Sequence, residues 1–385
     1  MAESESKSPG DRTLRLECFQ SDTVDRVRDA GGRWRLPGGV LRLPKVFGFC
    51  RGVERALAAL DQAVKGGHGG RIVLLGEIIH NPWVNDFFRR RGVQILTPDQ
   101  RDRLEEHLAA SDIAIIPAFG VAPGIQRRLE AIGCDVVDSS CGDVRRLWAW
   151  AERAARDGYG VAVFGRPNHD ETVVTKSRLA EAGGKYVVLQ NLPRVDDFCR
   201  QIDQPGRTPP FRDVFSTDET NADSPEDFAR LAQVSQTTML YEETLRVRRR
   251  IEQAFVDRFG RDEAEQRLLF QPTVCRATQR RQEAAVALCQ GGCDLVIVVG
   301  GVGSSNTRHL YELASQYVPA FFIEDARSIL SAERIETFNP PDPHPTVREG
   351  WLPTSRPLTI GVLAGASCPE IVIGDVLDTL ADLLR

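Results

Sequence analysis

Three cysteines that lie far apart in the chain open segments with the same pattern. They are Cys50 in CRGVER, Cys141 in CGDVRR and Cys275 in CRATQR. Each cysteine has Val or Thr three residues later and Arg five residues later, and each segment continues into a helix-like stretch. Thiolates are the usual ligands of iron–sulfur clusters, and the N-terminus of a helix favours a thiolate. The pattern therefore predicts that these three cysteines hold one cluster together.

The number of ligands bears on the chemistry of such a cluster. A cysteine-bound 4Fe–4S cluster usually takes four thiolates, one for each iron. With three, one iron keeps an open position and can act as a Lewis acid toward a substrate oxygen. We therefore expect one 4Fe–4S cluster per chain, with three Cys ligands and one open iron. We expect the remaining cysteines to be buried as small hydrophobic residues; these are Cys18, Cys134, Cys199, Cys289, Cys293 and Cys368.

Each of the three segments also predicts a helix followed by a short apolar strand. The strands RIVLLG, YGVAVFG and DLVIVVG end at Gly76, Gly165 and Gly300. Polar residues come next, namely His80, Asn81, Asn168, His169, Ser304, Ser305 and Asn306. A second set of strands leads to Phe119, to Thr237 and Thr238, and to Ser367. Alternating helices and Val/Ile-rich strands indicate parallel sheets, whose carboxyl ends carry ligand sites.

The repeat predicts an α/β fold of three lobes in a pseudo-threefold arrangement, with loops that meet at a common centre. We expect a mobile N-terminal extension over residues 1–43, a first lobe over 44–138, a second over 139–271 and a third over 272–351. The second lobe would contain a loop insertion over residues 201–227, which is rich in Pro, Asp and Arg and has no clear periodicity. The strand and helix of residues 352–385 would close the arrangement.

The composition narrows the class of protein. A chain of 385 residues suits two or three domains, and 42% hydrophobic with 27% charged residues is typical of a globular protein. A net charge of −5 argues against a nucleic-acid-binding surface. The longest apolar runs fall short of the roughly 20 residues that a membrane helix needs. The first residues, MAESESKSPGDR, lack the apolar core of a secretory signal. We therefore expect a cytoplasmic protein without a nucleic-acid or membrane partner.

At this point the sequence resembles a known family, the 4-hydroxy-3-methylbut-2-enyl diphosphate reductases of the non-mevalonate isoprenoid pathway. The resemblance runs from about Val46 to Leu384. It rests on the motifs FGFCRGVERA, GEIIHNPWVN, IIPAFG, NHDET, QTTML, CRATQRRQEA, GGVGSSNTRHL and AGASCP. The motifs PAFG and HDET are similar to those of the longer plant and cyanobacterial branch of the family.

The resemblance implies a trefoil of three α/β lobes around a 4Fe–4S cluster. It implies reductive removal of a hydroxyl from (E)-4-hydroxy-3-methylbut-2-enyl diphosphate, giving isopentenyl and dimethylallyl diphosphates, with ferredoxin or flavodoxin as the electron donor. By motif position, Glu171 would relay protons, and Thr237, helped by Thr238, would contact the substrate. The residues that would hold the diphosphate are His80, His169, Ser304, Ser305, Asn306 and Ser367.

Some of these residues also have ordinary structural explanations. Ser304 and its neighbours are typical helix caps, although a helix N-terminus also attracts phosphate. Glu171 has the position of a first-turn carboxylate favoured by the helix dipole. The chain departs from the family pattern at two positions. Phe119 replaces a His of the shorter enzymes, a change that the longer branch shares, and Gly142 stands where the family has Pro. Asp143, the next residue, adds negative charge near the expected cluster.

Two other functions remain open from the sequence. One is a non-catalytic iron–sulfur redox sensor that has kept the cluster and lost turnover, as Gly142 and Phe119 would allow. The other is a three-cysteine iron–sulfur enzyme similar to quinolinate synthase, which acts on dicarboxylates. Such an enzyme would need Arg or Tyr side chains near the cluster to bind carboxylates, whereas the motifs supply His, Ser, Thr and Asn.

Overall fold

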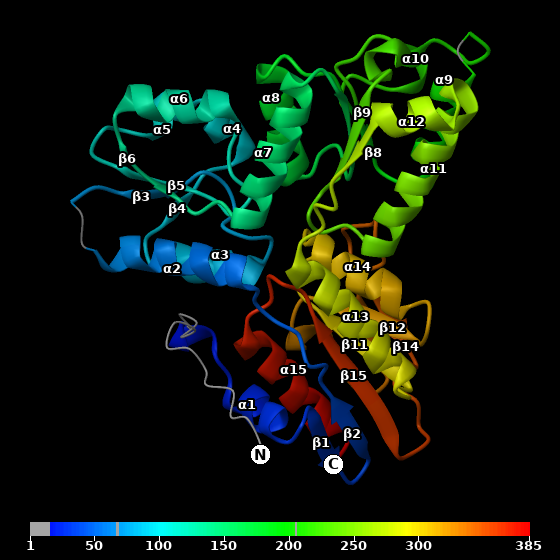
Figure 1. Ribbon diagram of the computed structural model, residues 1–385. Helices are drawn as coiled ribbons and strands as arrows, with labels where there is room; N and C mark the ends of the chain where they lie inside the picture. The colour runs from blue at the N-terminus through cyan, green and yellow to red at the C-terminus, as the bar shows by residue number, and fades with distance from the viewer. Residues whose placement is uncertain (1–15, 67–68, 205) are drawn as a thin grey trace, which may run out of the picture.

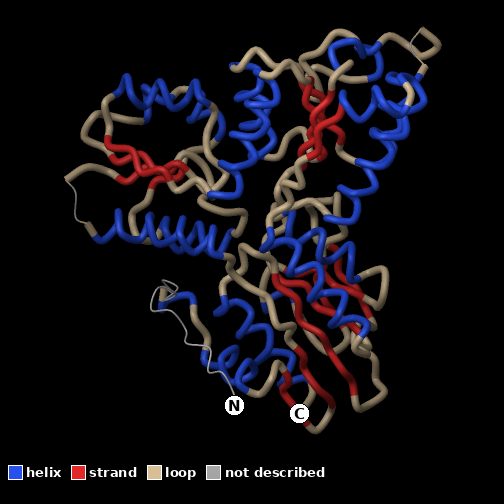
Figure 2. Tube along the Cα trace, in the orientation of Figure 1, coloured by secondary structure: helices blue, strands red, loops and turns tan. Residues whose placement is uncertain are grey.

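The computed structural model describes residues 16–66, 69–204 and 206–385, and it is a mixed α/β structure. Its strands form three larger sheets and one two-stranded sheet. Each larger sheet has its own set of helices, and the three groups surround a central region of loops and helix ends (Figure 1; Figure 2). Among the described residues, no helix has both the length and the apolar character needed to cross a bilayer.

The first sheet is entirely parallel, in the order β4-β3-β5-β6. Its strands are β3 (Ile72–Leu74), β4 (Gln94–Ile95), β5 (Ile113–Ile116) and β6 (Asp135–Asp138). Its helices are α2 (Arg51–Lys65), α3 (Pro82–Arg89), α4 (Pro98–Asp102), α5 (Leu104–His107) and α6 (Pro123–Ile132). Leu74 and Ile115 pack on the α2 side, whereas Val73 and Ala114 pack on the α6 side. Burial on both faces explains the uninterrupted apolar runs of β3 and β5.

The second sheet is also parallel, in the order β10-β9-β7-β8. Its strands are β7 (Gly160–Phe164), β8 (Tyr186–Leu189), β9 (Leu231–Ser235) and β10 (Leu268–Phe270). Its helices are α7 (Gly142–Arg156), α8 (Asp170–Glu181), α9 (Leu192–Asp203), α10 (Phe211–Val214), the short η2 (Pro225–Phe228), α11 (Tyr241–Phe259) and α12 (Arg261–Arg267). Two hydrophobic clusters, one on each face of the sheet, bury these strands.

The stretch 201–227 differs from the expected loop insertion. It contains the end of α9, all of α10 and the start of η2. Phe211 and Phe215 are buried in the core of the second sheet, where their rings contact Phe228 and Phe198. This stretch has no helical periodicity because its aromatic residues are buried individually from short turns and do not line one face of a long helix.

The third sheet is mixed, in the order β1-β2-β15-β11-β12. Its strands are β1 (Arg33–Leu36), β2 (Gly39–Arg42), β11 (Leu295–Val299), β12 (Ala320–Ile323) and β15 (Leu358–Ala364). Its helices are η1 (Glu17–Phe19), α1 (Asp22–Asp29), α13 (Arg276–Gln290), α14 (Ser305–Ala314), η3 (Ala326–Ser328) and α15 (Glu370–Leu383). β13 (Arg334–Thr337) and β14 (Thr346–Glu349) form a separate hairpin. The C-terminal strand β15 lies in the middle of the third sheet, between β2 and β11.

The expectation of a mobile N-terminal extension over residues 1–43 is wrong for the part from residue 17 to residue 42. There the chain forms η1, α1 and the antiparallel β1–β2 hairpin, and β2 pairs in parallel with β15. Val24 and Val27 of α1 are buried against the core beneath α15. Burial of these residues offsets the entropy lost on ordering the segment. Residues 1–15 lie outside the described residues.

The three repeat cysteines lie where the chain passes from one sheet to the next. Cys50 lies between β2 of the third sheet and α2 of the first. Cys141 lies between β6 and α7, and Cys275 lies between β10 and α13. Each cysteine occupies the N-cap position of the helix that follows it. The three crossings therefore bring equivalent helix ends to the centre of the molecule (Figure 1).

Candidate active site

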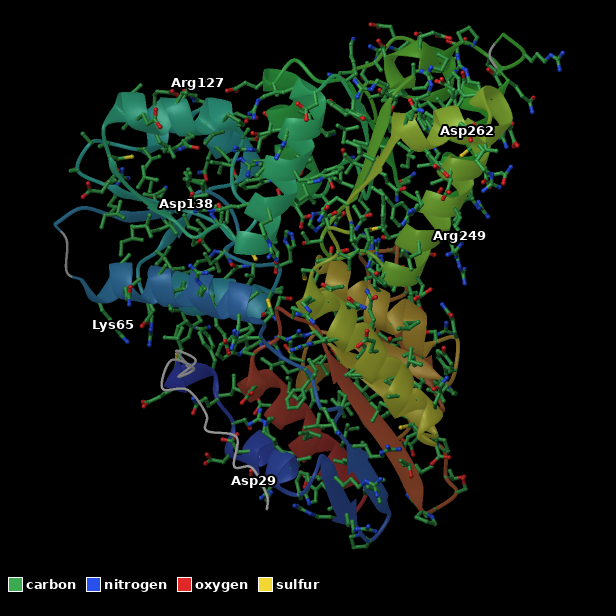
Figure 3. All side chains as sticks on the ribbon, viewed as in Figure 1. Asp29, Lys65, Arg127, Asp138, Arg249 and Asp262 are labelled. Atoms are coloured by element: carbon green, nitrogen blue, oxygen red, sulfur yellow. The ribbon has the colours of Figure 1, made fainter. Side chains whose placement is uncertain are left out.

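One cavity, with a volume of about 100 Å³, lies where the three groups of elements meet. All twelve site residues expected from the sequence line it. They are Cys50, His80, Cys141, His169, Glu171, Thr237, Thr238, Cys275, Ser304, Ser305, Asn306 and Ser367. Side chains from all three groups fill the surrounding central region (Figure 3). The loops after six strands (β3, β5, β7, β9, β11 and β15) supply the lining apart from the three cysteines and the first helical turns that follow them, as expected for the carboxyl ends of parallel strands.

The three cavity cysteines (Cys50, Cys141 and Cys275) enter from three separate helix N-termini. A Cβ atom placed on Gly52 would lie 2.6 Å from Cys141 Sγ and 3.7 Å from Cys50 Sγ. The first turn of α2 therefore leaves room for the sulfur of a cysteine from another group only because residue 52 has no side chain. The Cys275 sulfur accepts a hydrogen bond from the Thr278 backbone N–H at 3.4 Å.

As free thiols, two of the cavity cysteines, Cys141 and Cys275, are held protonated by burial. Burial raises the pKa of Cys275 to about 11, and it raises the pKa of Cys141 above its ordinary value. Backbone N–H groups of Asp143 and Val144 oppose this effect at Cys141. Ionisation of these thiols thus needs a bound positive partner, because only the thiolate binds metal.

Two histidines lie side by side at the cavity wall, and Phe119 packs against both. The His80 and His169 ring centroids are 5.3 Å apart, and Phe119 stacks on His80 at 4.2 Å. Nδ1 of His80 donates to the Glu77 carboxylate at 3.0 Å, while its buried Nε2 has no hydrogen-bond partner. Phe119 thus presents an apolar ring face that holds the plane of the His80 ring.

His169 is a neutral donor in this arrangement. It is only 8% exposed, and its Nδ1 accepts a hydrogen bond from the Glu171 backbone N–H at 3.2 Å. Burial lowers the pKa of His169 well below its usual value, and the positive groups around it add to this effect. Because Nδ1 is the acceptor of a neutral ring, Nε2 carries the proton. That N–H is available to a ligand.

The N-terminus of α14 supplies a group of hydroxyl and amide side chains. Ser304 is the N-cap, and its Oγ accepts from the Thr307 backbone N–H at 3.3 Å. Ser367 Oγ lies 3.2 Å from Ser304 Oγ. The Asn306 amide oxygen accepts from the Ala366 backbone N–H at 2.9 Å. Ser305 Oγ is buried without a partner. Ser304 is therefore a helix cap as well as part of the cavity wall, and the positive end of α14 faces an anion-sized space.

Glu171 and Thr237 form a buried pair across the cavity wall. Glu171 is 2% exposed, and its carboxylate accepts from the Thr237 backbone N–H at 2.6 Å and from the Thr237 hydroxyl at 2.7 Å. Burial raises the pKa of Glu171 to about 7, and the two hydrogen bonds from Thr237 oppose that rise. A carboxyl group with this pKa can both hold and release a proton near neutral pH.

One further residue of the cavity, Thr278, was not assigned a role from the sequence. Thr278 lies at the third position after its cysteine, where the other two segments have Val53 and Val144. Its hydroxyl is 3.2 Å from Cys275 Sγ and 3.4 Å from the Asn306 amide nitrogen, so it links a cavity cysteine to the α14 group. The sequence could have pointed to this role, because Thr278 is the only hydroxyl-bearing residue among the three equivalent positions.

The departure at Gly142, and the Asp143 that follows it, have mild structural consequences. A Cβ atom on Gly142 would meet no atom within 4 Å, and α7 begins there as a regular helix. Asp143 lines the cavity, but its carboxylate forms an ion pair with Arg146. The arginine partly offsets the extra negative charge beside Cys141.

Comparison with known proteins identifies relatives of the whole chain. A family model described as LytB protein matches residues 41–381. A protein of Thermosynechococcus vestitus named 4-hydroxy-3-methylbut-2-enyl diphosphate reductase is 34% identical over 364 residues, which cover 94% of this chain and 89% of the relative.

Two solved structures share the fold. One is (E)-4-hydroxy-3-methyl-but-2-enyl diphosphate reductase, described as the terminal enzyme of the non-mevalonate pathway. It has a TM-score of 0.53 and 24% identity, and the match covers 89% of this chain and 99% of that one. The other is the E-1-hydroxy-2-methyl-but-2-enyl-4-diphosphate reductase from Plasmodium falciparum. It has a TM-score of 0.65 and 21% identity, and the match covers 91% of this chain and 89% of that one.

Proposed function

The chain belongs to the LytB protein family, and we propose that it reduces (E)-4-hydroxy-3-methylbut-2-enyl diphosphate to isopentenyl and dimethylallyl diphosphates. The reaction replaces an allylic C–OH bond with C–H and releases water, so it consumes two electrons and two protons. It would be the last step of the non-mevalonate isoprenoid pathway. The observation that carries the proposal is a single cavity lined by three cysteines together with His and Ser side chains, among which His80 Nε2 and Ser305 Oγ have no hydrogen-bond partner.

We propose that the three groups of elements are the lobes of a trefoil, with lobes at residues 44–138, 139–271 and 272–351. The N-terminal hairpin and the segment 352–385 complete the third sheet. The position of each cavity cysteine at a crossing between sheets supports this arrangement. The cytoplasmic location expected from the sequence is part of the same proposal.

The residues present fit one 4Fe–4S cluster held by the three cavity cysteines. Among the described residues, no three His, Cys, Asp or Glu side chains lie close enough together for a single metal ion. A cluster of several irons sets its thiolates farther apart than one ion does, and the bare glycine at position 52 leaves space beside two of the sulfurs. Bound through these three thiolates, such a cluster would supply electrons and one open iron that could polarise the substrate oxygen.

The diphosphate would lie against the N-terminus of α14. Ser305 Oγ and His80 Nε2 are buried polar atoms without a hydrogen-bond partner, and the Asp170 carboxylate lies 3.6 Å from His80 Nε2. His169, whose Nε2 carries a proton, lines the same cavity. Ser304, Asn306 and Ser367 complete the set of convergent polar groups. Several charge-assisted hydrogen bonds hold a phosphate group far better than one does. The cysteines line the same cavity, so the organic end of a substrate bound there would lie within the space that they share.

Glu171 would supply a proton to the departing hydroxyl, with Thr237 beside the substrate. A hydroxyl leaves as water only when it gains a proton, and Glu171 holds one near neutral pH. The Thr237 hydroxyl is hydrogen-bonded to Glu171 and lines the cavity. It can therefore pass a proton between the carboxyl group and a ligand. The electrons would come from ferredoxin or flavodoxin, as the resemblance implies.

The alternative that resembles quinolinate synthase has no support in the cavity. Among the described residues that line it, none is Arg or Tyr, so nothing matches a dicarboxylate. The sensor alternative and the reductase predict different outcomes in one assay. Anaerobically purified protein would be analysed for iron and sulfide and then supplied with the hydroxy-allylic diphosphate and a strong artificial reductant. Formation of both diphosphate products is expected. An intact cluster without turnover would refute the reductase proposal in favour of the sensor.

A further inference from the structure

A buried arginine lies beside the cavity cysteines and has no evident reason to be there. Arg281 is in the second turn of α13, the helix that begins after Cys275, and it is 4% exposed. One of its terminal nitrogens donates to the Ala277 carbonyl at 2.8 Å, and the other donates to the Gly48 carbonyl at 2.6 Å. Its Nε is buried without a partner. No carboxylate among the described residues forms an ion pair with it.

A guanidinium in this position is costly unless an anion accompanies it. Taking a charge out of water is unfavourable, and two carbonyl groups satisfy hydrogen bonds without neutralising the charge. The groups whose negative charge would act on Arg281 most are Cys50 and Cys275, followed by Glu54. As thiols, the two cysteines carry no charge. As ligands of a cluster, they would carry the negative charge that the arginine lacks.

The hydrogen bond to Gly48 gives Arg281 a second role. Gly48 lies two residues before Cys50, in the segment that links β2 to α2. Gly48 has a φ of +67°, a conformation that suits a glycine in a tight turn. Arg281 therefore ties the turn that delivers Cys50 to the helix that begins at Cys275. It is the only described side chain that hydrogen-bonds the Gly48 carbonyl.

We propose that Arg281 is a positioning residue of the iron–sulfur site: it fixes the Cys50 turn against α13 and supplies a buried positive charge that favours the reduced cluster. This inference rests on the cluster in the proposed function. One-electron reduction adds one negative charge to the cluster, so a fixed cation nearby stabilises the reduced form more than the oxidised form. Removal of the charge makes reduction harder, and removal of the tether loosens one of the three ligands.

The neighbouring residue provides a matched control. Arg280 carries the same charge on the same helix but is exposed. Solvent screens an exposed charge, so Arg280→Gln is expected to leave the cluster unchanged. Two variants of the buried position separate its two roles. Arg281→Gln removes the charge, whereas Arg281→Lys keeps the charge but cannot reach both carbonyl groups with one planar fork.

The experiment uses the anaerobically purified, cluster-containing protein. A redox titration with mediator dyes, followed by electron paramagnetic resonance, gives the reduction potential. Release of iron to a chelator gives the stability of the cluster. For Arg281→Gln we expect a more negative potential. The ratio of reduced to oxidised cluster at a fixed potential should fall at least about tenfold, which is 59 mV for a one-electron couple. Arg281→Lys should stay within about threefold of the wild-type ratio but lose iron several times faster.

The outcomes distinguish this inference from the proposed function. If the wild-type chain has no cluster, both are refuted. If the wild type has its cluster and Arg281→Gln keeps the wild-type potential and rate of iron loss, this inference alone is refuted. An equal shift of the reduction potential in Arg281→Lys and Arg281→Gln would refute the role of the buried positive charge. If Arg281→Gln does not fold, Arg281→Lys still tests the tether, because wild-type iron retention in that variant would contradict it.

Discussion

Replacement of Glu171 by Gln should separate proton supply from every other function of the cavity. The Glu171 carboxylate accepts one hydrogen bond from the Thr237 backbone N–H and another from the Thr237 hydroxyl. A Gln side chain keeps the first bond through its carbonyl oxygen and can donate to the hydroxyl through its amide nitrogen. The shape and contacts of the wall are therefore retained. Only the ability to hold and release a proton is lost.

The size of the effect follows from the pKa of Glu171. The pKa is raised from an ordinary value of 4.5 to about 7, a shift that corresponds to about 3 kcal/mol against the ionised form. At pH 7 about half of the chains carry the proton on Glu171, whereas in water only about 0.3% would do so. General acid catalysis typically contributes about 10²–10⁴-fold in rate. We expect Glu171→Gln to lose turnover by a factor in that range, with substrate affinity nearly unchanged.

The pH dependence has a definite sign. In the proposed mechanism the protonated form of Glu171 is the active one, so the wild-type rate should be constant below pH 7 and should fall about tenfold per pH unit above it. The residual rate of Glu171→Gln should lack this fall. Steady-state reduction of the hydroxy-allylic diphosphate by an artificial reductant gives both profiles, and a binding titration gives the affinity.

The matched control is Glu243→Gln. Burial also raises the pKa of the Glu243 carboxyl, but Glu243 lies on α11 and does not line the cavity. This variant should keep the wild-type rate and pH profile. Full activity of Glu171→Gln, or an unchanged fall in rate above pH 7 in that variant, would refute the assignment of Glu171 as the proton donor.

Three further predictions concern the cavity. Gly52→Ala should lose most of the bound iron, because the added Cβ would clash with the Cys141 sulfur. Gly142→Ala should keep its iron because the space there is open, and equal iron content in the two variants would contradict the packing argument. Single replacement of each cavity cysteine by Ser should also abolish most iron and sulfide binding, whereas Cys289→Ser, in a hydrophobic core, should not. Equal iron and sulfide contents in all four variants would exclude the three cavity cysteines as ligands. The diphosphate substrate should bind at least about tenfold more tightly than its monophosphate or free alcohol, because each lost charge-assisted hydrogen bond is worth about 1.5–3 kcal/mol. A binding titration that shows equal affinity for the three ligands would refute the diphosphate site at α14.

Several features of the molecule were predictable because their signals are local. The three helices begin directly after Cys50, Cys141 and Cys275, as the repeated pattern predicts. The strands at DLVIVVG and YGVAVFG form where apolar runs predict them. The family prediction is confirmed by the match over residues 41–381. Because the carboxyl ends of parallel strands meet at one edge of a sheet, even the convergence of the site residues followed from local patterns.

Other features depend on contacts between distant segments, which a single sequence does not specify. The hairpin β1–β2 looked like part of a polar tail, and it is ordered because β2 pairs with β15 more than 300 residues later. Gly52 gives no sign in the sequence that the Cys141 sulfur lies against it. In the sequence, Arg281 looks like an ordinary charged residue of a helix, and only the fold shows that it hydrogen-bonds the Gly48 carbonyl. Local propensity thus determined the elements and the set of reactive residues. Only the tertiary structure decided which residues surround these reactive side chains, because their neighbours come from distant parts of the chain. Burial and long-range pairing then set the charge, spacing and rigidity of the site.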